Sequence, residues 1–261
     1  AEQIVATLQG LEQIVLVGSK PPVSFFAYPG KPSWCAPESC EFSHLALPHE
    51  DGAAALAAVA DALGAAGLEP ARTPLVLPDL PSGALNAATA AQVIAHLTPE
   101  DAILADESAT AGLPLLMFMA RARPHTHLPL TGGSIGQGLP LAVGAAIAAP
   151  GRKVVCPHGD GGAAYTVQAL WTMAREKLDV TTVIFANRSY AILNIELQRV
   201  GADSGPKALS MLDLGNPDLD WVALATGMGV EAVRVDSIDA FGDAFASAMS
   251  QQGPRLIEAV L

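Results

Sequence analysis

The sequence predicts an α/β fold: a doubly wound parallel sheet preceded by a smaller, partial Rossmann-like α/β unit. Three observations carry this prediction. Short apolar runs alternate with helix-like stretches from residue 86 to the C-terminus, glycine-rich turns follow several of these runs, and a proline-rich stretch precedes them. Strands that alternate with helices form parallel sheets covered on both faces. Such sheets bind ligands at the carboxyl ends of their strands, so we expect the functional site there.

The smaller unit comes first. Apolar runs at 14–17 and 41–47 predict two strands, and the Ala-rich stretch 50–67 predicts a helix that ends at Gly64 and Gly67. Prolines then recur from Pro70 to Pro81, as in an extended linker. We therefore predict a partial α/β unit over 1–66, a linker over 67–85 and a ligand-binding domain over 86–261.

The elements of the larger domain follow from hydrophobic periodicity and turn residues. Runs rich in Val, Ile and Leu predict strands, and the longer Ala- and Leu-rich stretches between them predict helices. The predicted strands are 102–106, 127–131, 153–157, 180–186, 230–235 and 255–261. The predicted helices are 86–97, 111–122, 136–149, 163–175, 190–199, 218–227 and 237–251.

Composition excludes several classes of partner. The 26 acidic residues outnumber the 14 basic ones and give a net charge of −12, which argues against nucleic acid. Apolar residues make up 51% of the chain, but no apolar run reaches the roughly 18 residues of a membrane span, so we expect no membrane partner. An odd number of cysteines, Cys35, Cys40 and Cys156, favours a reducing cytoplasm. The start without methionine or signal peptide indicates a truncated or processed N-terminus.

Two polar residues follow neighbouring predicted strands, and they suggest a metal site. Asp160 comes after strand 153–157 and Asn187 directly after strand 180–186. If the strands are neighbours, a carboxylate and an amide oxygen meet at one sheet edge, and such hard ligands suit Mg²⁺. Either residue alone would more often be an ordinary turn residue, because Asp-Gly and Asn commonly end strands. Their combined placement favours a site.

Glycines beside Asp160 extend this hypothesis to an anion. Gly159, Gly161 and Gly162 carry no side chain where a backbone must approach an anion closely. Ala163 is expected to start a helix, whose N-terminal N–H groups favour phosphate. The sequence therefore predicts a Mg²⁺–diphosphate clamp.

A second glycine-rich element, "LTGGSIGQGLPLAVGAA" (130–146), also follows a strand and opens a helix. Ser134 lies in a G-x-S-x-G pattern typical of a hydrolase nucleophile elbow. A hydrolase also needs an acid and then a histidine downstream, yet only His158 follows and residues 135–157 contain no Asp or Glu. The glycine order does not match G-x-G-x-x-G, so a dinucleotide site is not favoured either.

The elements "GGSIGQGLP", "GDGG" and Asn187 together resemble the diphosphate-binding domain of thiamine-diphosphate enzymes, in the acetolactate synthase and benzoylformate decarboxylase group. The resemblance covers residues 86–261, and 1–66 resemble the second half of that family's central domain. It implies the thiamine-diphosphate-binding fold. It also implies that Asp160, Asn187 (27 positions later) and the carbonyl of Ser189 bind Mg²⁺.

The resemblance also implies how the cofactor is held. The carbonyl of Gly133 would face the aminopyrimidine group, and Ile135 would be the apolar wedge that bends the cofactor. Ser108 and Thr110, in "ESAT", match a loop that contacts the diphosphate. The full set of cofactor-binding residues implied is Ser108, Thr110, Gly133, Ser134, Ile135, Gly159, Asp160, Gly161, Gly162, Asn187, Ser189, Tyr190, Ala191 and Ile192.

The implied reaction is decarboxylation of a 2-oxo acid with carboligation, as in an acetolactate synthase large subunit. A benzoylformate-type decarboxylase is the alternative, because "ALW" (169–171) and "YAIL" (190–193) resemble that enzyme. Two positions depart from the family. Ala186 replaces the first of two asparagines, and Leu193 replaces the glutamate of pyruvate-decarboxylase-type members.

The family's activating glutamate belongs to a separate pyrimidine-binding domain of a neighbouring subunit, which residues 1–85 do not resemble. The catalytic residue is therefore unknown here, and we expect a partner domain, a homodimeric or homotetrameric parent and no activity without that domain. A non-catalytic cofactor-binding fragment is the alternative, and a bound flavin stays an open question. Within the chain, we expect Glu107 to orient the diphosphate loop and Glu196 to be solvated. His125 and His127 precede the glycine loop, where they could face substrate, but a histidine near a strand is more often simply hydrogen-bonded to its surroundings.

Overall fold

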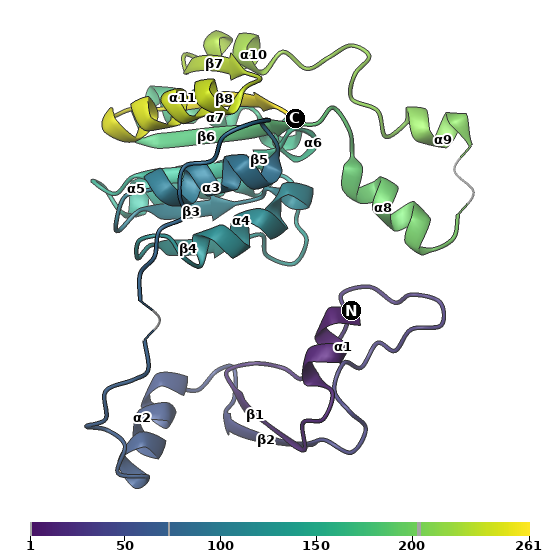
Figure 1. Ribbon diagram of the computed structural model, residues 1–261, viewed down its shortest axis with the longest axis vertical. Coiled ribbons are helices and arrows are strands. Elements are labelled where there is room, and N and C mark those ends of the chain that lie inside the picture. The colour runs from purple at the N-terminus through teal and green to yellow at the C-terminus, as the bar shows by residue number, and fades with distance from the viewer. Residues whose placement is uncertain (1, 73, 203–204) are drawn as a thin grey trace. The chain divides into compact units, whose positions relative to one another are not determined.

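The computed structural model describes residues 2–72, 74–202 and 205–261. The chain forms two compact units, Ala1–Thr73 with Arg199–Ala202 and Pro74–Gln198 with Asp203–Leu261 (Figure 1). Of the predicted segments, Ala1 of the first unit, Thr73 of the linker and residues 203–204 of the ligand-binding domain lie outside the described residues. No described helix combines the length and the hydrophobicity needed to cross a bilayer.

The smaller unit contains two parallel strands and two helices. Its elements are α1 (Glu2–Leu8), β1 (Gln13–Val17), β2 (Glu41–Ala46) and α2 (Gly52–Ala62). β1 and β2 pair in parallel, with Gln13 opposite Glu41. Asp51 caps α2 by accepting a hydrogen bond from the N–H of Ala54 at 2.9 Å. The helix ends before the predicted residue 67 because Gly64 adopts a left-handed conformation, with φ of 67°.

The larger unit is a six-stranded parallel sheet, which confirms the predicted α/β class. Its strands are β3 (Ile103–Asp106), β4 (Thr126–Pro129), β5 (Val154–Gly159), β6 (Val180–Ala186), β7 (Glu231–Val235) and β8 (Arg255–Val260). The strand order is β4-β3-β5-β6-β8-β7, and every neighbouring pair is parallel. β5 and β6 are neighbours, as the predicted clamp requires.

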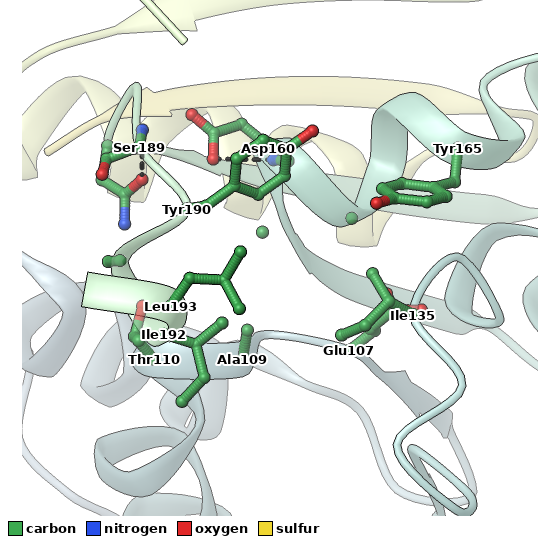
Figure 2. Close-up of a pocket in the computed structure, with 15 residues that line it drawn as sticks. Glu107, Ala109, Thr110, Ile135, Asp160, Tyr165, Ser189, Tyr190, Ile192 and Leu193 are labelled. Carbon is green, nitrogen blue, oxygen red and sulfur yellow. Dashed lines mark hydrogen bonds between the residues drawn. The ribbon is translucent and has the colours of Figure 1, made fainter. Parts of the chain in front are cut away.

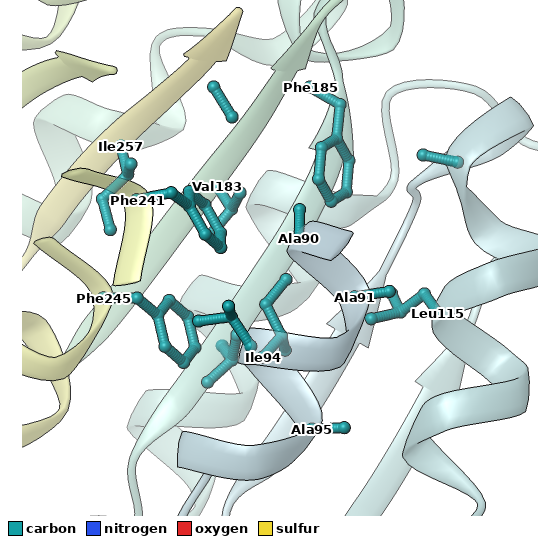
Figure 3. Close-up of a cluster of buried hydrophobic side chains, with 14 of the residues drawn as sticks. Ala90, Ala91, Ile94, Ala95, Leu115, Val183, Phe185, Phe241, Phe245 and Ile257 are labelled. Atoms are coloured by element: carbon teal, nitrogen blue, oxygen red, sulfur yellow. The ribbon is translucent and has the colours of Figure 1, made fainter. Parts of the chain in front are cut away.

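Helices cover both faces of this sheet. α3 (Ala87–Leu97), α4 (Gly112–Met119) and α11 (Ile238–Ser250) pack on one face, and α5 (Gly138–Ala148), α7 (Ala169–Arg175) and α10 (Trp221–Gly227) on the other. Residues of β6 alternate between the two cores: Val183 and Phe185 pack toward α3 and α11 (Figure 3), whereas Val180 and Ile184 pack on the opposite face. This alternation is what a strand buried on both sides requires.

The segments that follow β3 and β5 cross to opposite faces of the sheet. β3 leads through the 3₁₀ turn η1 (Ala109–Ala111) into α4, and β5 leads through α6 (Asp160–Ala163) and η2 (Ala164–Thr166) to α7. Their diverging paths leave a crevice between the carboxyl ends of β3 and β5, the usual place for a ligand in this fold.

The predicted helix 163–175 is wrong in its start and its continuity. The chain becomes helical at Asp160, directly after extended Gly159, and it breaks into α6, η2 and α7. Ala163 therefore ends the first turn instead of beginning a helix. The predicted helix 218–227 starts later, at Trp221, because Asp220 caps it through the N–H of Ala223. Helices α8 (Ala191–Arg199) and α9 (Pro206–Ser210) follow β6, and α9 was not predicted.

Candidate functional site

A cavity of about 150 Å³ opens at the carboxyl ends of β3, β5 and β6. Figure 2 shows Asp160 and Tyr190 on one side of it and Ile135 and Glu107 on the other. The residues that line it are Glu107, Ala109, Thr110, Ile135, Gly159, Asp160, Gly161, Gly162, Tyr165, Asn187, Ser189, Tyr190, Ala191, Ile192 and Leu193. Four separate segments thus meet where the fold predicts a ligand.

Asp160 and Glu107 both line this cavity with buried carboxylates, and 4% of Asp160 is exposed. Oδ1 of Asp160 accepts the N–H of Gly161 at 2.8 Å, and its Oδ2 accepts the N–H of Arg188 at 2.7 Å. Burial raises the pKa of Asp160, and these backbone donors oppose that rise. A cation beside the carboxylate would offset the cost of burying its charge.

Asn187 and Ser189 form the turn that follows β6. Asn187 Oδ1 accepts the N–H of Ser189 at 3.0 Å, which fixes the amide side chain over the turn. The hydroxyl of Ser189 donates to the carbonyl of Leu212 at 3.2 Å and accepts from Asn194 Nδ2 at 3.0 Å. With its hydroxyl engaged elsewhere, Ser189 has its backbone carbonyl as the available group for the cavity.

The donor types at this edge fit Mg²⁺. A carboxylate, an amide oxygen and a backbone carbonyl are hard oxygen ligands, and Mg²⁺ in proteins takes few of them together with phosphate oxygens and water. Within the described ranges, no group of three or more His, Cys, Asp and Glu side chains could hold a metal by itself. A metal at Asp160 would therefore need the oxygens of Asn187, of Ser189 and of a ligand.

Two glycines of the turn are required by close packing. A Cβ on Gly161 would lie 2.6 Å from Cε1 of Tyr190, and a Cβ on Gly162 would lie 2.6 Å from Oε1 of Glu107. Real Cβ atoms do not approach other atoms so closely. These glycines let α6 sit directly against both walls of the cavity, with its first N–H groups at the sheet edge.

Most of the predicted cofactor-binding residues lie together, but three do not line the cavity. Ser108 is buried, and its hydroxyl donates to Asp106 Oδ1 at 2.5 Å. Gly133 and Ser134 lie in the preceding loop, where the carbonyl of Gly133 accepts the N–H of Ile135 at 3.0 Å. The predicted residues that do line the cavity are Thr110, Ile135, Gly159, Asp160, Gly161, Gly162, Asn187, Ser189, Tyr190, Ala191 and Ile192.

Sequence reasoning missed Ala109 and Tyr165 as lining residues and treated Leu193 only as a departure from the family. Ala109 has a positive φ of 50°, which no sequence pattern signals for alanine. Tyr165 is 63% exposed and Leu193 46% exposed, so both form the open rim. Whether Tyr165 and Leu193 reach the cavity depends on the directions of η2 and α8, and the local sequence pattern does not determine these directions.

Glu107 and the two histidines before the glycine loop all make local hydrogen bonds. The side chain of Glu107 accepts hydrogen bonds from the glycine loop, whereas Asp106 holds the loop that begins at Ser108. His127 Nε2 lies 3.3 Å from Asp106 Oδ2, and His125 Nδ1 lies 2.8 Å from the carbonyl of Arg123. The residues lining the cavity include neither histidine.

The fold and this cavity define a doubly wound α/β protein with a ligand site at the carboxyl ends of its strands. Residues 113–259 match the family described as thiamine pyrophosphate enzyme, C-terminal TPP binding domain. The chain belongs to this family of thiamine-diphosphate enzymes, which confirms the resemblance found in its glycine motifs.

The chain is also similar in sequence to individual proteins named for particular reactions. The chain is 51% identical, over its whole length, to a candidate acetolactate synthase large subunit, IlvX, of Mycobacterium tuberculosis, and it covers 51% of that protein. It is 32% identical over 67% of its length to a benzoylformate decarboxylase of Pseudomonas aeruginosa, covering 32% of that enzyme. The chain therefore spans about half of the first curated relative and about a third of the second.

A solved structure extends the similarity to the fold. The thiamine diphosphate-dependent 4-hydroxybenzoylformate decarboxylase of Rhodococcus jostii RHA1 superposes on 97% of this chain with a TM-score of 0.76 and 27% identity. The match covers 49% of that structure. Proteins named for acetolactate synthesis and proteins named for benzoylformate decarboxylation are thus both similar to this chain.

Proposed function

We propose that this chain is the cofactor-binding part of a thiamine-diphosphate- and Mg²⁺-dependent enzyme that decarboxylates a 2-oxo acid and joins the product to a second carbonyl compound. One observation carries the proposal: Asp160 and Asn187 follow neighbouring strands and line the same cavity beside a glycine turn. The 51% identity to an acetolactate synthase-like relative favours carboligation as the reaction.

In this proposal each group has a defined task. Asp160, Asn187 and the carbonyl of Ser189 hold Mg²⁺, and the N–H groups at the start of α6 face the diphosphate. Ile135 packs against the organic part of the cofactor from the opposite side of the cavity. Thiamine diphosphate, when bound, supplies the carbon nucleophile and the electron sink, and the chain orients it.

A benzoylformate-type decarboxylase is the second candidate function. The rim of the cavity is apolar and partly aromatic, since Ile135, Tyr165, Ile192 and Leu193 lie there. An aromatic 2-oxo acid suits such a rim better than pyruvate does, because it buries more apolar surface. The R. jostii structure, which superposes on almost all of the chain, is named for such a substrate.

The small volume of the cavity supports the proposal that a partner domain completes the ligand site. Its volume of about 150 Å³ is below the roughly 300 Å³ at which small-molecule pockets usually begin, so the chain encloses only part of a ligand. We infer that a pyrimidine-binding domain of another subunit supplies the remaining wall and the activating glutamate, in a homodimeric or homotetrameric parent. Residues 1–66 would be part of a central domain, 67–85 a linker and 86–261 the cofactor-binding domain.

We also propose a cytoplasmic location. Cys35, Cys40 and Cys156 are all buried free thiols, as in proteins of a reducing compartment. Burial raises the pKa of the Cys156 thiol well above its usual range, so this sulfur stays protonated and unreactive.

The test is a native mass spectrum and a calorimetric titration with thiamine diphosphate, each with and without Mg²⁺. Mg²⁺-dependent binding of one cofactor per site is the expected result, and absence of binding in both conditions would refute the proposal. Product analysis with pyruvate and with benzoylformate, in the presence of a pyrimidine-binding partner, then separates the two reactions. Binding without turnover of either would favour the non-catalytic alternative.

A further inference from the structure

The carboxylate of Glu107 bridges two backbone N–H groups of the glycine loop, residues 131–137, and of the helix that follows it. Its Oε1 accepts the N–H of Gly136 and its Oε2 the N–H of Gly138, both at 2.6 Å. Glu107 is only 2% exposed, although it is a charged residue. Carboxylates are rarely buried unless hydrogen bonds or ion pairs replace their lost hydration. The two glycine N–H groups supply such hydrogen bonds to Glu107.

Glu107 is itself fixed in place by the sheet. Its N–H donates to the carbonyl of Pro157 and its carbonyl accepts the N–H of Gly159, each at 3.0 Å, which continues the pairing of β3 with β5. The fully buried His158 places Nε2 3.2 Å from Glu107 Oε2. The carboxylate is therefore a rigid attachment point, and the glycine loop is what it holds.

The loop needs such an attachment. Gly132, Gly133 and Gly136 all have positive φ angles, so this segment has a wide choice of conformations before it is fixed. Gly136 is held on both sides: its N–H by Glu107, and its carbonyl by the hydroxyl of Thr166 at 2.8 Å. Ile135 comes directly before this peptide, and Figure 2 shows it beside Glu107 at the cavity.

Only a carboxylate satisfies both donors. A glutamine of the same shape would keep one oxygen for one glycine N–H and would turn its own N–H₂ donor toward the other. We propose that Glu107 is a positioning residue: its carboxylate fixes the glycine loop and thereby places Ile135 against the cofactor, opposite Asp160. The cofactor contact rests on the proposed function, whereas the fixing of the loop does not.

The first test is hydrogen exchange of Glu107→Gln without cofactor. Amide exchange in residues 131–138 should increase about tenfold or more, as expected for loss of a buried hydrogen bond to a charged group, while α11 and β8 stay protected. Glu258→Gln is the matched control, because Glu258 is 4% exposed and pairs with Arg234 Nε at 2.9 Å. It should leave the loop unchanged. An unchanged loop in Glu107→Gln, or a loss of protection spread over the whole unit, would overturn the proposal.

The second test compares two ligands, thiamine diphosphate and inorganic pyrophosphate, each with Mg²⁺. Glu107→Gln should weaken thiamine diphosphate binding about tenfold but leave pyrophosphate affinity nearly unchanged, because only the former reaches Ile135. Equal weakening of both would contradict the positioning of Ile135. If the wild-type chain binds neither ligand, the proposed function fails and the exchange measurement alone decides the role of Glu107.

A more conservative variant guards against misfolding of Glu107→Gln. Glu107→Asp keeps the charge, but its shorter side chain cannot reach both N–H groups. Its loop should exchange faster than wild type with α11 unaffected, and a loop as protected as that of wild type would count against the proposal.

Discussion

The carboxylate of Asp160 accepts a hydrogen bond from the backbone N–H of Arg188 at 2.7 Å, although the two residues lie 28 positions apart. This bond ties the turn after β5 to the turn after β6. Asn187 and Ser189, on either side of Arg188, are thereby held next to the carboxylate. The geometry explains how two polar residues far apart in sequence come to share one edge of the sheet.

Replacing Asp160 with Asn should abolish Mg²⁺-dependent cofactor binding while leaving the chain folded. Replacing a residue that only hydrogen-bonds to a metal ligand costs about 10- to 100-fold in metal affinity. Loss of the ligand itself should therefore cost on the order of 100-fold or more. Titration calorimetry with thiamine diphosphate and Mg²⁺ measures this. Asp218→Asn, at a half-exposed aspartate that pairs with Arg188, is the control. Equal affinity in wild type and Asp160→Asn would refute the clamp.

Replacing Ile135 with Ala should weaken the binding of thiamine diphosphate about tenfold, because an apolar contact with the cofactor is lost. Ile135 is 43% exposed, so the free energy of unfolding should change by no more than about 0.5 kcal/mol. Ile147→Ala, at an isoleucine of α5 that is 58% exposed and does not line the cavity, is the matched control. Similar affinities in the two variants would show that Ile135 does not contact the cofactor.

The fold, and the placement of Asp160 and Asn187 at one edge of the sheet, were predictable from the sequence. β6 matches its predicted range of 180–186 because this short segment is rich in β-branched and aromatic residues, which favour a strand, and because all seven of its residues are buried. Asp160 and Asn187 were placed correctly at the sheet edge because the carboxyl ends of parallel neighbouring strands meet there. The bounds of β6 follow from its own residues, and the placement of Asp160 and Asn187 follows once β5 and β6 are taken as neighbours.

The rest of the site depends on contacts between distant segments. Glu107 reaches Gly136 and Gly138 across 29 and 31 positions. The two segments meet because helix α5, which begins at Gly138, packs against β3 and β5. Likewise, the early helical turn at Asp160 fits because Gly161 and Gly162 pack against Tyr190 and Glu107. Hydrophobic periodicity contains no information on such close approaches.

Replacing Gly138 with Ala should destabilise the protein, whereas the same change at Gly144 should not. Both glycines lie in α5, but a Cβ at Gly138 would lie 2.7 Å from Cδ2 of His158 and 2.9 Å from Cβ of Glu107. We expect Gly138→Ala to lower the free energy of unfolding by about 1–3 kcal/mol through overpacking. At Gly144 a Cβ has no neighbour within 4 Å, so alanine should raise it by about 0.5–1 kcal/mol. Urea unfolding measures both values, and equal effects would contradict the packing described.

Glu107 should make the stability of the fold depend on pH in the acidic range. Burial alone would raise the pKa of Glu107, but the adjacent imidazole of His158, with the N–H groups of Gly136 and Gly138, holds it below its usual value of 4.5. A lowered pKa in the folded state means that the ionised carboxylate stabilises the fold at every pH above the unfolded-state value. That contribution is lost as the pH falls through the folded-state pKa.

Wild type should therefore exceed Glu107→Gln in free energy of unfolding near neutral pH, and the difference should shrink as the pH falls below about 4.5. Urea unfolding at a series of pH values gives both curves. Glu176→Gln removes a carboxylate that is 49% exposed, and its curve should follow that of wild type within about 0.5 kcal/mol. If the curves of wild type and Glu107→Gln stay parallel down through the acidic range, the ionised carboxylate contributes nothing to the fold, and the two glycine N–H groups need another explanation.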